Sequence, residues 1–165
     1  MTRCLLREYS ADDAPRFHKI LSDPVTMCFW PEPFSLGQTE SRINRGMKSY
    51  LNNGFGRWTA ETRSAEVLIR VAGIMISGVN EKTENGLGYI IRSPFWNNGY
   101  VTEAAAVILC VELDSIVLSR IVANIPHDHS SPAGVAKKTV MKKEFEFINK
   151  RNRDILTYLY AINKD

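Results

Sequence analysis

The sequence predicts an α/β fold of the mixed α+β kind, in which about four helices flank a central mixed sheet of about six to seven strands. Helix-type and strand-type hydrophobic periodicities alternate along the chain in the order β-α-α-β-β-β-α-β-α-β-β. The 165 residues are enough for one domain with one sizeable core. Because no repeat, low-complexity segment or linker interrupts the sequence, we expect residues 1–165 to form a single domain.

The first third of the chain is typical of one strand followed by two helices. Residues 3–9 alternate weakly between apolar and polar side chains, as a strand does. A Ser-x-x-Asp capping box opens a helix over 10–21, and an Asp-Pro pair ends it. An aromatic, proline-stiffened loop over 28–34 then leads to a serine-capped helix over 35–51, which an Asn-Asn-Gly turn closes.

Three strands are expected in the middle of the chain. The first covers residues 55–62, and the second covers 65–76, which is rich in β-branched residues and has Gly73 as a candidate bulge. Residues 80–85 are polar and predict a turn. A short apolar strand over 87–92 follows it.

The last third begins with a long helix over 99–115 and a buried strand over 121–125. A short helix over 133–143 and a closing strand pair, 145–148 with 155–162, complete the chain. The buried face expected for the long helix consists of Val101, Ala104, Val107 or Ile108, and Val111.

Residues 92–106 are the most informative stretch, because a buried strand there runs through a Gly/Asn turn directly into an apolar helix. A helix N-terminus leaves unpaired backbone N–H groups and a positive dipole end, which together suit a phosphate. No Lys follows Gly99, so this is not the phosphate loop of nucleotide hydrolases. The absence of Gly-x-Gly-x-x-Gly likewise gives no indication of a dinucleotide fold.

This stretch resembles the acetyl-CoA loop of the GNAT N-acetyltransferase superfamily, Gln/Arg-x-x-Gly-x-Gly/Ala. It is most similar to the branch that acetylates the N-terminal alanine of ribosomal proteins, where the loop often reads Trp-Gly-x-Gly-Tyr-Ala-Thr-Glu-Ala. Here residues 96–104 read Trp-Asn-Asn-Gly-Tyr-Val-Thr-Glu-Ala. Residues 71–74 and 88–92 resemble that family's third and fourth strands. The resemblance covers the whole chain and implies the GNAT fold.

The resemblance implies transfer of an acetyl group from acetyl-CoA, as cosubstrate and without a metal, to a primary amine that attacks directly in a ternary complex. Backbone N–H groups over 97–102 would hold the pyrophosphate, and Asn97 suits a positive φ almost as glycine does. A backbone N–H near Ile91 would polarise the thioester carbonyl. The residues implied at the cosubstrate are Ile90, Ile91, Arg92, Asn97, Asn98, Gly99, Tyr100, Val101, Thr102 and His129.

The general base is less clearly marked. Many GNAT relatives carry a Glu where this chain has Gly86, and Glu84, two residues earlier, is the candidate in its place. An α-amino group has a pKa of about 7.7–8.0, against about 10.4 for lysine, and therefore needs less help to lose its proton. The missing Glu favours a protein N-terminal α-amine as acceptor.

The segment that carries the acid in relatives is altered. Aligning residues 135–138 with the family's Val-Ala-x-Lys places His129 at its Asn, Pro132 at its Ser and Val140 at a later Gly. A β-branched residue is costly at the positive φ with which such a helix ends. Either the helix ends differently here, or this alignment is wrong.

Several side chains remain candidates for the acid that protonates the CoA thiolate. Ser131 or Ser130 offers a hydroxyl near the altered position. His129 titrates near neutrality and would act as a proton shuttle or a pantetheine contact, unless it is an ordinary exposed loop histidine. Tyr160 and Tyr158 share one face of the last strand, where a tyrosine also packs in cores.

Phe29, Trp30 and Phe34 lie in the loop that covers the acceptor side in GNAT relatives, and form either an acceptor pocket or a plain hydrophobic lid. Small amines are the second acceptor class. Two other interpretations stay open: a degenerate acyl-CoA-binding regulator without turnover, and a purely structural domain.

Composition limits the other partners. The net charge is only +3, and the basic residues over 137–153 form a solvated face or a rim for cofactor phosphates, with no aromatic motif for nucleic acid. No apolar run approaches the roughly 20 residues of a membrane span. Three widely spaced cysteines favour a reducing cytoplasm over a disulfide framework or zinc site, and Cys110 is expected in the core. We expect a monomer or homodimer.

Overall fold

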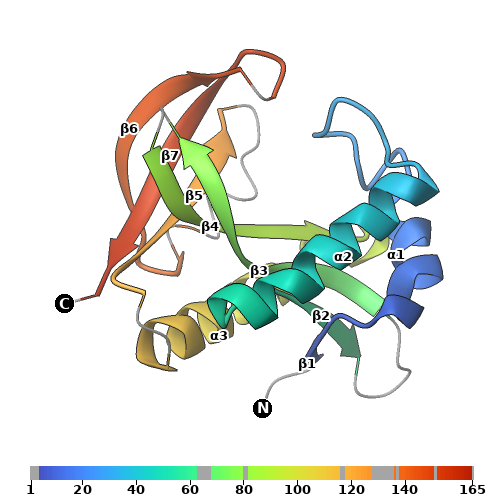
Figure 1. Cartoon of the computed structure of the whole chain (residues 1–165). Coiled ribbons are helices and arrows are strands. Elements are labelled where there is room, and N and C mark those ends of the chain that lie inside the picture. The colour runs from blue at the N-terminus through green and yellow to red at the C-terminus, as the bar shows by residue number, and fades with distance from the viewer. Residues whose placement is uncertain are drawn as a thin grey trace. The chain divides into compact units, whose positions relative to one another are not determined.

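The computed structural model describes residues 4–62, 68–79, 82–115, 118–127, 136, 138–150 and 152–164. Its seven strands form one mixed sheet in the order β1-β2-β3-β4-β5-β7-β6, which confirms the predicted fold class (Figure 1). The strands are β1 Cys4–Glu8, β2 Arg57–Thr62, β3 Leu68–Val79, β4 Lys82–Ile91, β5 Arg120–Pro126, β6 Lys142–Asn149 and β7 Ile155–Asn163. The helices are α1 Ala14–Leu21, α2 Leu36–Asn53 and α3 Tyr100–Ser115, with short 3-10 helices η1 Ala11–Asp13 and η2 Ser93–Phe95.

The chain divides into two compact units. The first consists of Met1–Gly73 and Tyr89–Tyr100, and the second of Ile74–Gly88 and Val101–Asp165. Strands β3 and β4 therefore each contribute residues to both units.

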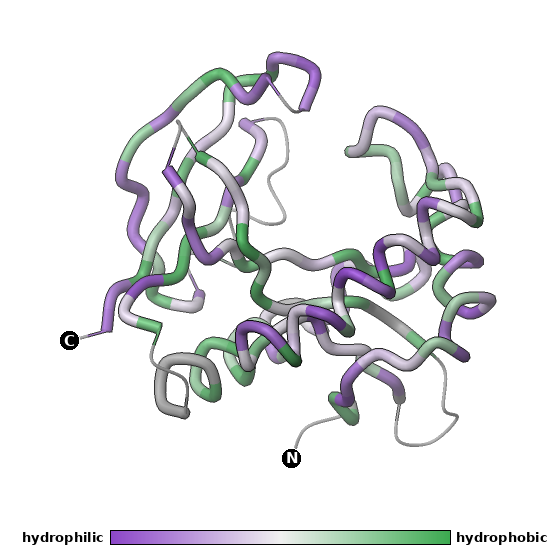
Figure 2. Tube along the Cα trace, in the orientation of Figure 1, coloured by the Kyte–Doolittle hydropathy of each residue, from purple (hydrophilic) through white to green (hydrophobic). Residues whose placement is uncertain are grey.

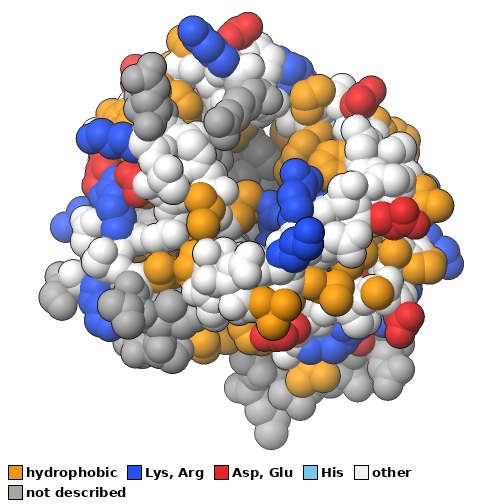
Figure 3. All heavy atoms as spheres, viewed as in Figure 1, with side chains coloured by type: hydrophobic (Ala, Val, Ile, Leu, Met, Phe, Trp, Pro, Cys, Tyr) orange, Lys and Arg blue, Asp and Glu red, His pale blue; other side chains and the backbone are white. Residues whose placement is uncertain are grey.

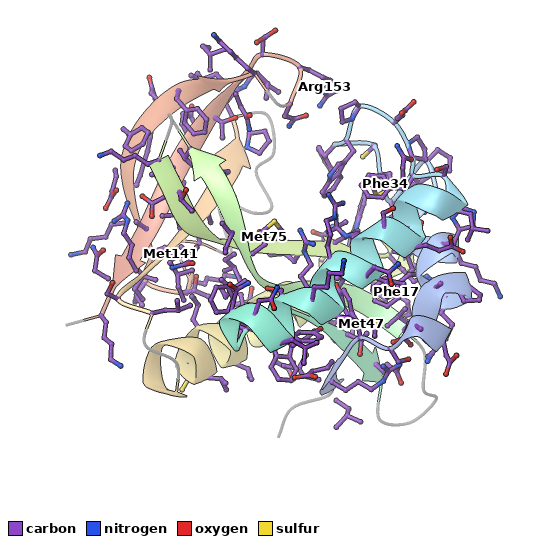
Figure 4. The ribbon with its side chains drawn as sticks, in the orientation of Figure 1. Phe17, Phe34, Met47, Met75, Met141 and Arg153 are labelled. Carbon is purple, nitrogen blue, oxygen red and sulfur yellow. The ribbon has the colours of Figure 1, made fainter. Side chains whose placement is uncertain are left out.

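In the first unit, β2 pairs antiparallel with β1 on one side and with β3 on the other. Helices α1 and α2 lie side by side (Figure 1) and fill a core with the sheet residues. Phe17 of α1 is fully buried there and Met47 of α2 packs against the same cluster (Figure 4). The buried members of the cluster are Tyr9, Phe17, Ile20, Leu21, Met27, Ile43, Leu68, Val71 and Ile90.

The two N-terminal helices begin where their capping residues predict. Asp13 accepts a hydrogen bond from the Ser10 backbone N–H at 2.8 Å and opens α1 after one turn of 3-10 helix. Ser35 accepts from the Gln38 N–H at 3.2 Å and opens α2. Gly54, with φ of 73°, ends α2 in the left-handed conformation that glycine adopts without strain.

In the second unit, β7 pairs antiparallel with both β5 and β6, and β4 pairs parallel with β5. The turn between β6 and β7 is hydrophilic (purple in Figure 2). Ile121 and Leu159, on the paired strands β5 and β7, are almost completely buried. The apolar content of these strands thus accounts for the core of this unit.

Two sequence-based expectations about the strands and helices need correction. The polar stretch from residue 82 is strand rather than turn, because a β ladder pairs backbone groups and tolerates exposed polar side chains. On the side of β3 that faces β2, the register shift falls at Ala60 and Glu61, while the candidate bulge Gly73 pairs with Arg57 and has φ of 155°. The helix expected over 133–143 ends earlier, since Lys142 and Lys143 already belong to β6. Residues 133–135 and 137 lie outside the described part.

The buried face of α3 also differs from the prediction. The buried residues are Ala104, Ala105, Ile108 and Leu109. Val111 is 44% exposed and Cys110 is exposed. Since α3 is apolar nearly all round, its periodicity alone does not indicate which side is buried. None of the helices in the described part is long and apolar enough for a membrane crossing.

Candidate active site

The segment that joins β4 to α3 is held by its own side chains. The Trp96 indole Nε1–H donates to the Ile91 carbonyl oxygen at 2.8 Å, and the Asn98 amide donates to the Trp96 carbonyl at 3.0 Å. The short helix η2 lies between them, and its first residues include Pro94. These local bonds set the direction in which the chain enters α3.

Two residues of this segment have left-handed backbone conformations. Asn97 has φ of 60° and Gly99 has φ of 76°, and α3 begins at the next residue, Tyr100. Asparagine and glycine are the residues that adopt this conformation at least cost. The first N–H groups of a helix have no acceptor within it, so this turn and helix start fit a pyrophosphate.

A hydrogen-bonded clip ties this segment to the loop after α1. The Ser93 backbone N–H donates to Thr26 Oγ1 at 3.0 Å, and Ser93 Oγ lies 3.4 Å from Asp23 Oδ2. The Thr26 hydroxyl also donates to Asp23. This bond from Thr26 is the main reason that the pKa of Asp23 lies below its usual range. The sequence indicated Asp23 only as a helix stop, so the clip was missed.

Aromatic rings line the same segment. The Phe29 ring lies 6.3 Å from that of Trp96, and the Phe95 and Tyr100 rings meet edge to face at 6.0 Å. The Arg92 guanidinium carbon lies 5.8 Å from the centre of the Phe95 ring. One of the three predicted acceptor aromatics therefore lies against the predicted cosubstrate loop.

The other two predicted acceptor aromatics face the core of the first unit. Trp30 and Phe34 are half-buried and pack against the core cluster around Phe17 and Met47. The guanidinium carbon of Arg42 lies 5.6 Å from the centre of the Phe34 ring. The position of Phe34 is labelled in Figure 4.

Gly86 lies where a side chain has little room. It is the one β4 residue with a register partner in β5, Val122, among the described residues of these strands. A Cβ at Gly86 would lie 2.8 Å from Ser77 Oγ and 3.4 Å from the Met75 carbonyl oxygen. A glutamate at this position would therefore require Ser77 to move.

The candidate base Glu84 is engaged in an ion pair. Arg120 Nε lies 3.3 and 3.2 Å from the two carboxylate oxygens of Glu84, and its Nη2 lies 2.6 Å from Glu144. The hydrogen bond to Glu144 is the main cause that raises the pKa of Arg120, so Arg120 is cationic at any physiological pH.

Only the tyrosines among the candidate acids lie in the described part of the chain. Tyr160 is buried on β7, opposite Ala123 and Lys143, while the Lys143 Nζ lies 3.7 Å from the centre of the Tyr158 ring. His129, Ser130 and Ser131 lie outside the described residues.

Val140 has the backbone conformation that the family alignment requires. Its φ is 55°, and the Met141 N–H donates to the Ala136 carbonyl at 3.1 Å, the pattern of a Schellman helix end. Val140 is 75% exposed and Met141 is buried. Neither alternative raised by the sequence is needed, because the helix ends at the aligned position with valine in a conformation that favours glycine.

Residues 3–142 match the family model described as the acetyltransferase (GNAT) domain. The chain belongs to the GNAT acetyltransferases. An acetyltransferase of the GNAT family from Bacillus anthracis is 22% identical, with TM-score 0.82 over 99% of this chain and 96% of that one. Ribosomal-protein-S5-alanine acetyltransferase from Vibrio fischeri has 15% identity and TM-score 0.84, covering 100% and 95%. Spermidine N-acetyltransferase from Vibrio cholerae, solved with CoA and spermine, has 16% identity and TM-score 0.79, covering 98% and 96%.

This GNAT acetyltransferase is thus an acyltransferase with the predicted fold. The sequence did not indicate the buried polar groups of the first unit, Arg42 and Tyr9 among them. Both are more than nine-tenths buried, and each has a side-chain atom without a hydrogen-bond partner. A single sequence gives no signal for this, because an arginine in an amphipathic helix normally lies on its solvated face.

Proposed function

We propose that this GNAT acetyltransferase moves the acetyl group of acetyl-CoA to the α-amine of a protein N-terminus. The observation that supports acetyl-CoA as the cosubstrate is the pair of left-handed residues, Asn97 and Gly99, directly before the N–H groups that open α3. In the reaction, the neutral amine nitrogen bonds to the acetyl carbonyl carbon, the carbon–sulfur bond breaks, and the CoA thiolate takes up a proton.

The single carboxylate of β4 and the glycine at position 86 favour one acceptor class. Position 86 carries no side chain and is closely approached by Ser77, and the carboxylate of Glu84 is paired with Arg120. A lysine amine, with a pKa of about 10.4, depends more on a base than an α-amine of about 7.7–8.0 does. This supports an N-terminal α-amine that loses its proton to water. The candidate for a protein base that takes up the amine proton is Glu84. The candidates for the acid that protonates the CoA thiolate are His129, Ser131 and Tyr160. We also propose a cytoplasmic location.

The experiment combines calorimetric titration of acetyl-CoA with a thiol-release assay. The acceptors are N-terminal peptides, a lysine side-chain peptide and spermidine. We expect micromolar acetyl-CoA binding and CoA release with the N-terminal peptides. If CoA is released only with spermidine, the acceptor is a small amine and not a protein N-terminus. If acetyl-CoA binds but no acceptor leads to CoA release, the protein has lost turnover.

Gly99→Val tests the cosubstrate loop. A β-branched residue at φ of 76° is strained by about 1–2 kcal/mol, so the turn should rearrange and acetyl-CoA affinity should fall at least about tenfold in the titration. Gly37→Val is the matched control, because Gly37 has an ordinary φ and a Cβ added there would meet nothing within 4 Å. Normal acetyl-CoA affinity in a folded Gly99→Val protein would refute the loop assignment.

A further inference from the structure

Among the residues that the structure describes, Arg42 is a buried cation without an acidic partner. It lies on α2 with 9% of its surface exposed, and its Nε has no hydrogen-bond partner. Elsewhere in the described residues, half-buried guanidinium groups such as those of Arg7 and Arg120 bind carboxylates at 2.6–2.8 Å. Burying a guanidinium is costly unless an anion compensates it, so this position calls for an explanation.

The surroundings of Arg42 add positive charge rather than removing it. Burial lowers the pKa of Arg42, and the charge of Arg45 lowers it further. Burial also lowers the pKa of Arg57, to about 9, and the nearby charge of Arg42 contributes. Three arginines of α2 and β2 therefore repel one another in the first unit.

The neighbouring tyrosines do not supply the missing negative charge. Burial raises the pKa of Tyr9, so its phenol is neutral at physiological pH, and its hydroxyl has no hydrogen-bond partner within the described part of the chain. Burial raises the pKa of Tyr50 to about 12, and its hydroxyl donates to the Arg57 carbonyl oxygen. The Tyr50 hydroxyl is fully used, because it also accepts a hydrogen bond from the Tyr9 backbone N–H at 3.1 Å. Only the neutral hydroxyl of Tyr9 is therefore left, among the described residues of these two tyrosines, as a donor or acceptor for a ligand.

Packing brings these groups together and connects them to the predicted acceptor loop. Gly46, one turn after Arg42, lets α2 approach the Tyr9 ring so closely that a Cβ would lie 2.7 Å from it. On its other side Arg42 lies over the ring of Phe34, from the 28–34 loop. Basic side chains gather in the middle of the face seen in Figure 3, by the position of α2 in Figure 1.

We propose that Arg42, within the positive field of Arg45 and Arg57, binds a carboxylate carried by the acceptor. This deepens the proposed function and rests on it. A guanidinium binds a carboxylate through two parallel hydrogen bonds, and the bond gains strength where water is largely excluded. The same field disfavours a polyamine, whose cationic arms would be repelled. The carboxylate belongs to an acidic side chain near the acetylated N-terminus, or to the α-carboxylate of a small amine.

The test compares thiol release for peptides that differ only by Glu or Gln at the second, third or fourth residue, with alanine, alaninamide and spermidine alongside. The protein variants are Arg42→Met and the matched control Lys48→Gln, a change of an exposed cation on the same helix. If an acidic side chain supplies the carboxylate, we expect kcat/KM for one Glu peptide to exceed that for its Gln counterpart at least about tenfold. If the α-carboxylate of a small amine supplies it, we expect the same preference for alanine over alaninamide.

Arg42→Met should abolish that preference by lowering kcat/KM on the carboxylate-bearing acceptor at least about tenfold, whereas Lys48→Gln should leave the preference intact. The Tm of the Arg42→Met variant should not fall, because the change removes an uncompensated buried charge, and acetyl-CoA affinity should be unchanged. A merely structural Arg42 would instead lower Tm and leave the preference intact. The carboxylate site would be overturned by equal rates within both pairs of acceptors, Glu with Gln peptides and alanine with alaninamide. A preference for spermidine would overturn it too. Either result would leave acetyl transfer established. Binding of acetyl-CoA without release for any acceptor would overturn the proposed function itself.

Discussion

At the scale of single residues, Asn97 and Val140 show how far a backbone position dictates its side chain. Both have φ near 60°, and the family resemblance aligns both with positions that often carry glycine. Asparagine adopts this conformation at low cost, whereas valine is among the residues that resist it most. The strain at Val140 persists because the buried Met141 and its bond to Ala136 hold the helix end in place.

Val140→Gly should therefore stabilise the protein. Relief of the strained φ, about 1–2 kcal/mol, exceeds the extra chain entropy of glycine, about 0.5–1 kcal/mol, so the free energy of unfolding should rise by about 1 kcal/mol. Urea denaturation measures this. Val25→Gly, at another exposed valine whose φ is not positive, should destabilise the protein, and an equal gain there would contradict the explanation.

At the scale of the elements, a charged network joins β1, β2 and the start of α1. Arg7 of β1 binds Asp13 of η1 at 2.7 Å and Glu61 of β2 at 2.7 Å. Glu61 also binds Arg16 of α1 at 2.9 Å. Burial alone would raise the pKa of Asp13, but the hydrogen bonds from Arg7 and Ser10 outweigh it and hold that pKa below its usual range. This network differs from the surroundings of Arg42, because Arg7 and Arg16 bind carboxylates.

Asp13→Asn should cost about 2 kcal/mol of unfolding free energy at pH 7, because it removes the buried carboxylate that binds the Arg7 guanidinium at 2.7 Å. The folded pKa of Asp13 is depressed, so its stabilisation is complete above the unfolded value of about 3.9 and is lost as pH falls through the folded value. Denaturation at pH 7 and at pH 3 measures the free energy of unfolding of wild type and variant. The difference between the two proteins should be smaller at pH 3 than at pH 7. Asp12→Asn, at the exposed neighbour in η1, serves as control, and a difference that does not depend on pH would contradict the assignment.

At the scale of the whole molecule, the two compact units share strands β3 and β4. Neither unit keeps a complete β3 or β4 by itself, so we expect them to unfold together as the single domain that the sequence predicts. Trp30, Trp58 and Trp96 all lie in the first unit and report on it by fluorescence.

The measurement is urea unfolding followed by tryptophan fluorescence and by a fluorophore attached to the exposed Cys110 of the second unit. The labelled protein carries Cys4→Ser and Cys28→Ser, because Cys28 of the first unit is also exposed and would take the label. Coincident midpoints are expected, and the unlabelled protein followed by circular dichroism controls for the label. Two separated transitions would mean that the units are independent domains.

Most of the fold was predictable because its signals are local. The capping boxes at Ser10 and Ser35 and the strand–turn–helix at 92–106 each depend on residues within one turn or hairpin. Predictions failed where the local pattern was ambiguous: the polar start of β4 has the composition of a turn, and the apolar residues of α3 mark no single face.

The sequence by itself determined the order of elements, the GNAT family and the turn that prepares α3 for a phosphate, because backbone conformation at Asn97 and Gly99 depends mainly on those residues themselves. Only the tertiary structure decided that Arg42 is buried beside Phe34, that Glu84 is paired with Arg120, and that Thr26 clips the loop through Ser93. These contacts join different elements of the fold, and they form only when packing brings whole elements together.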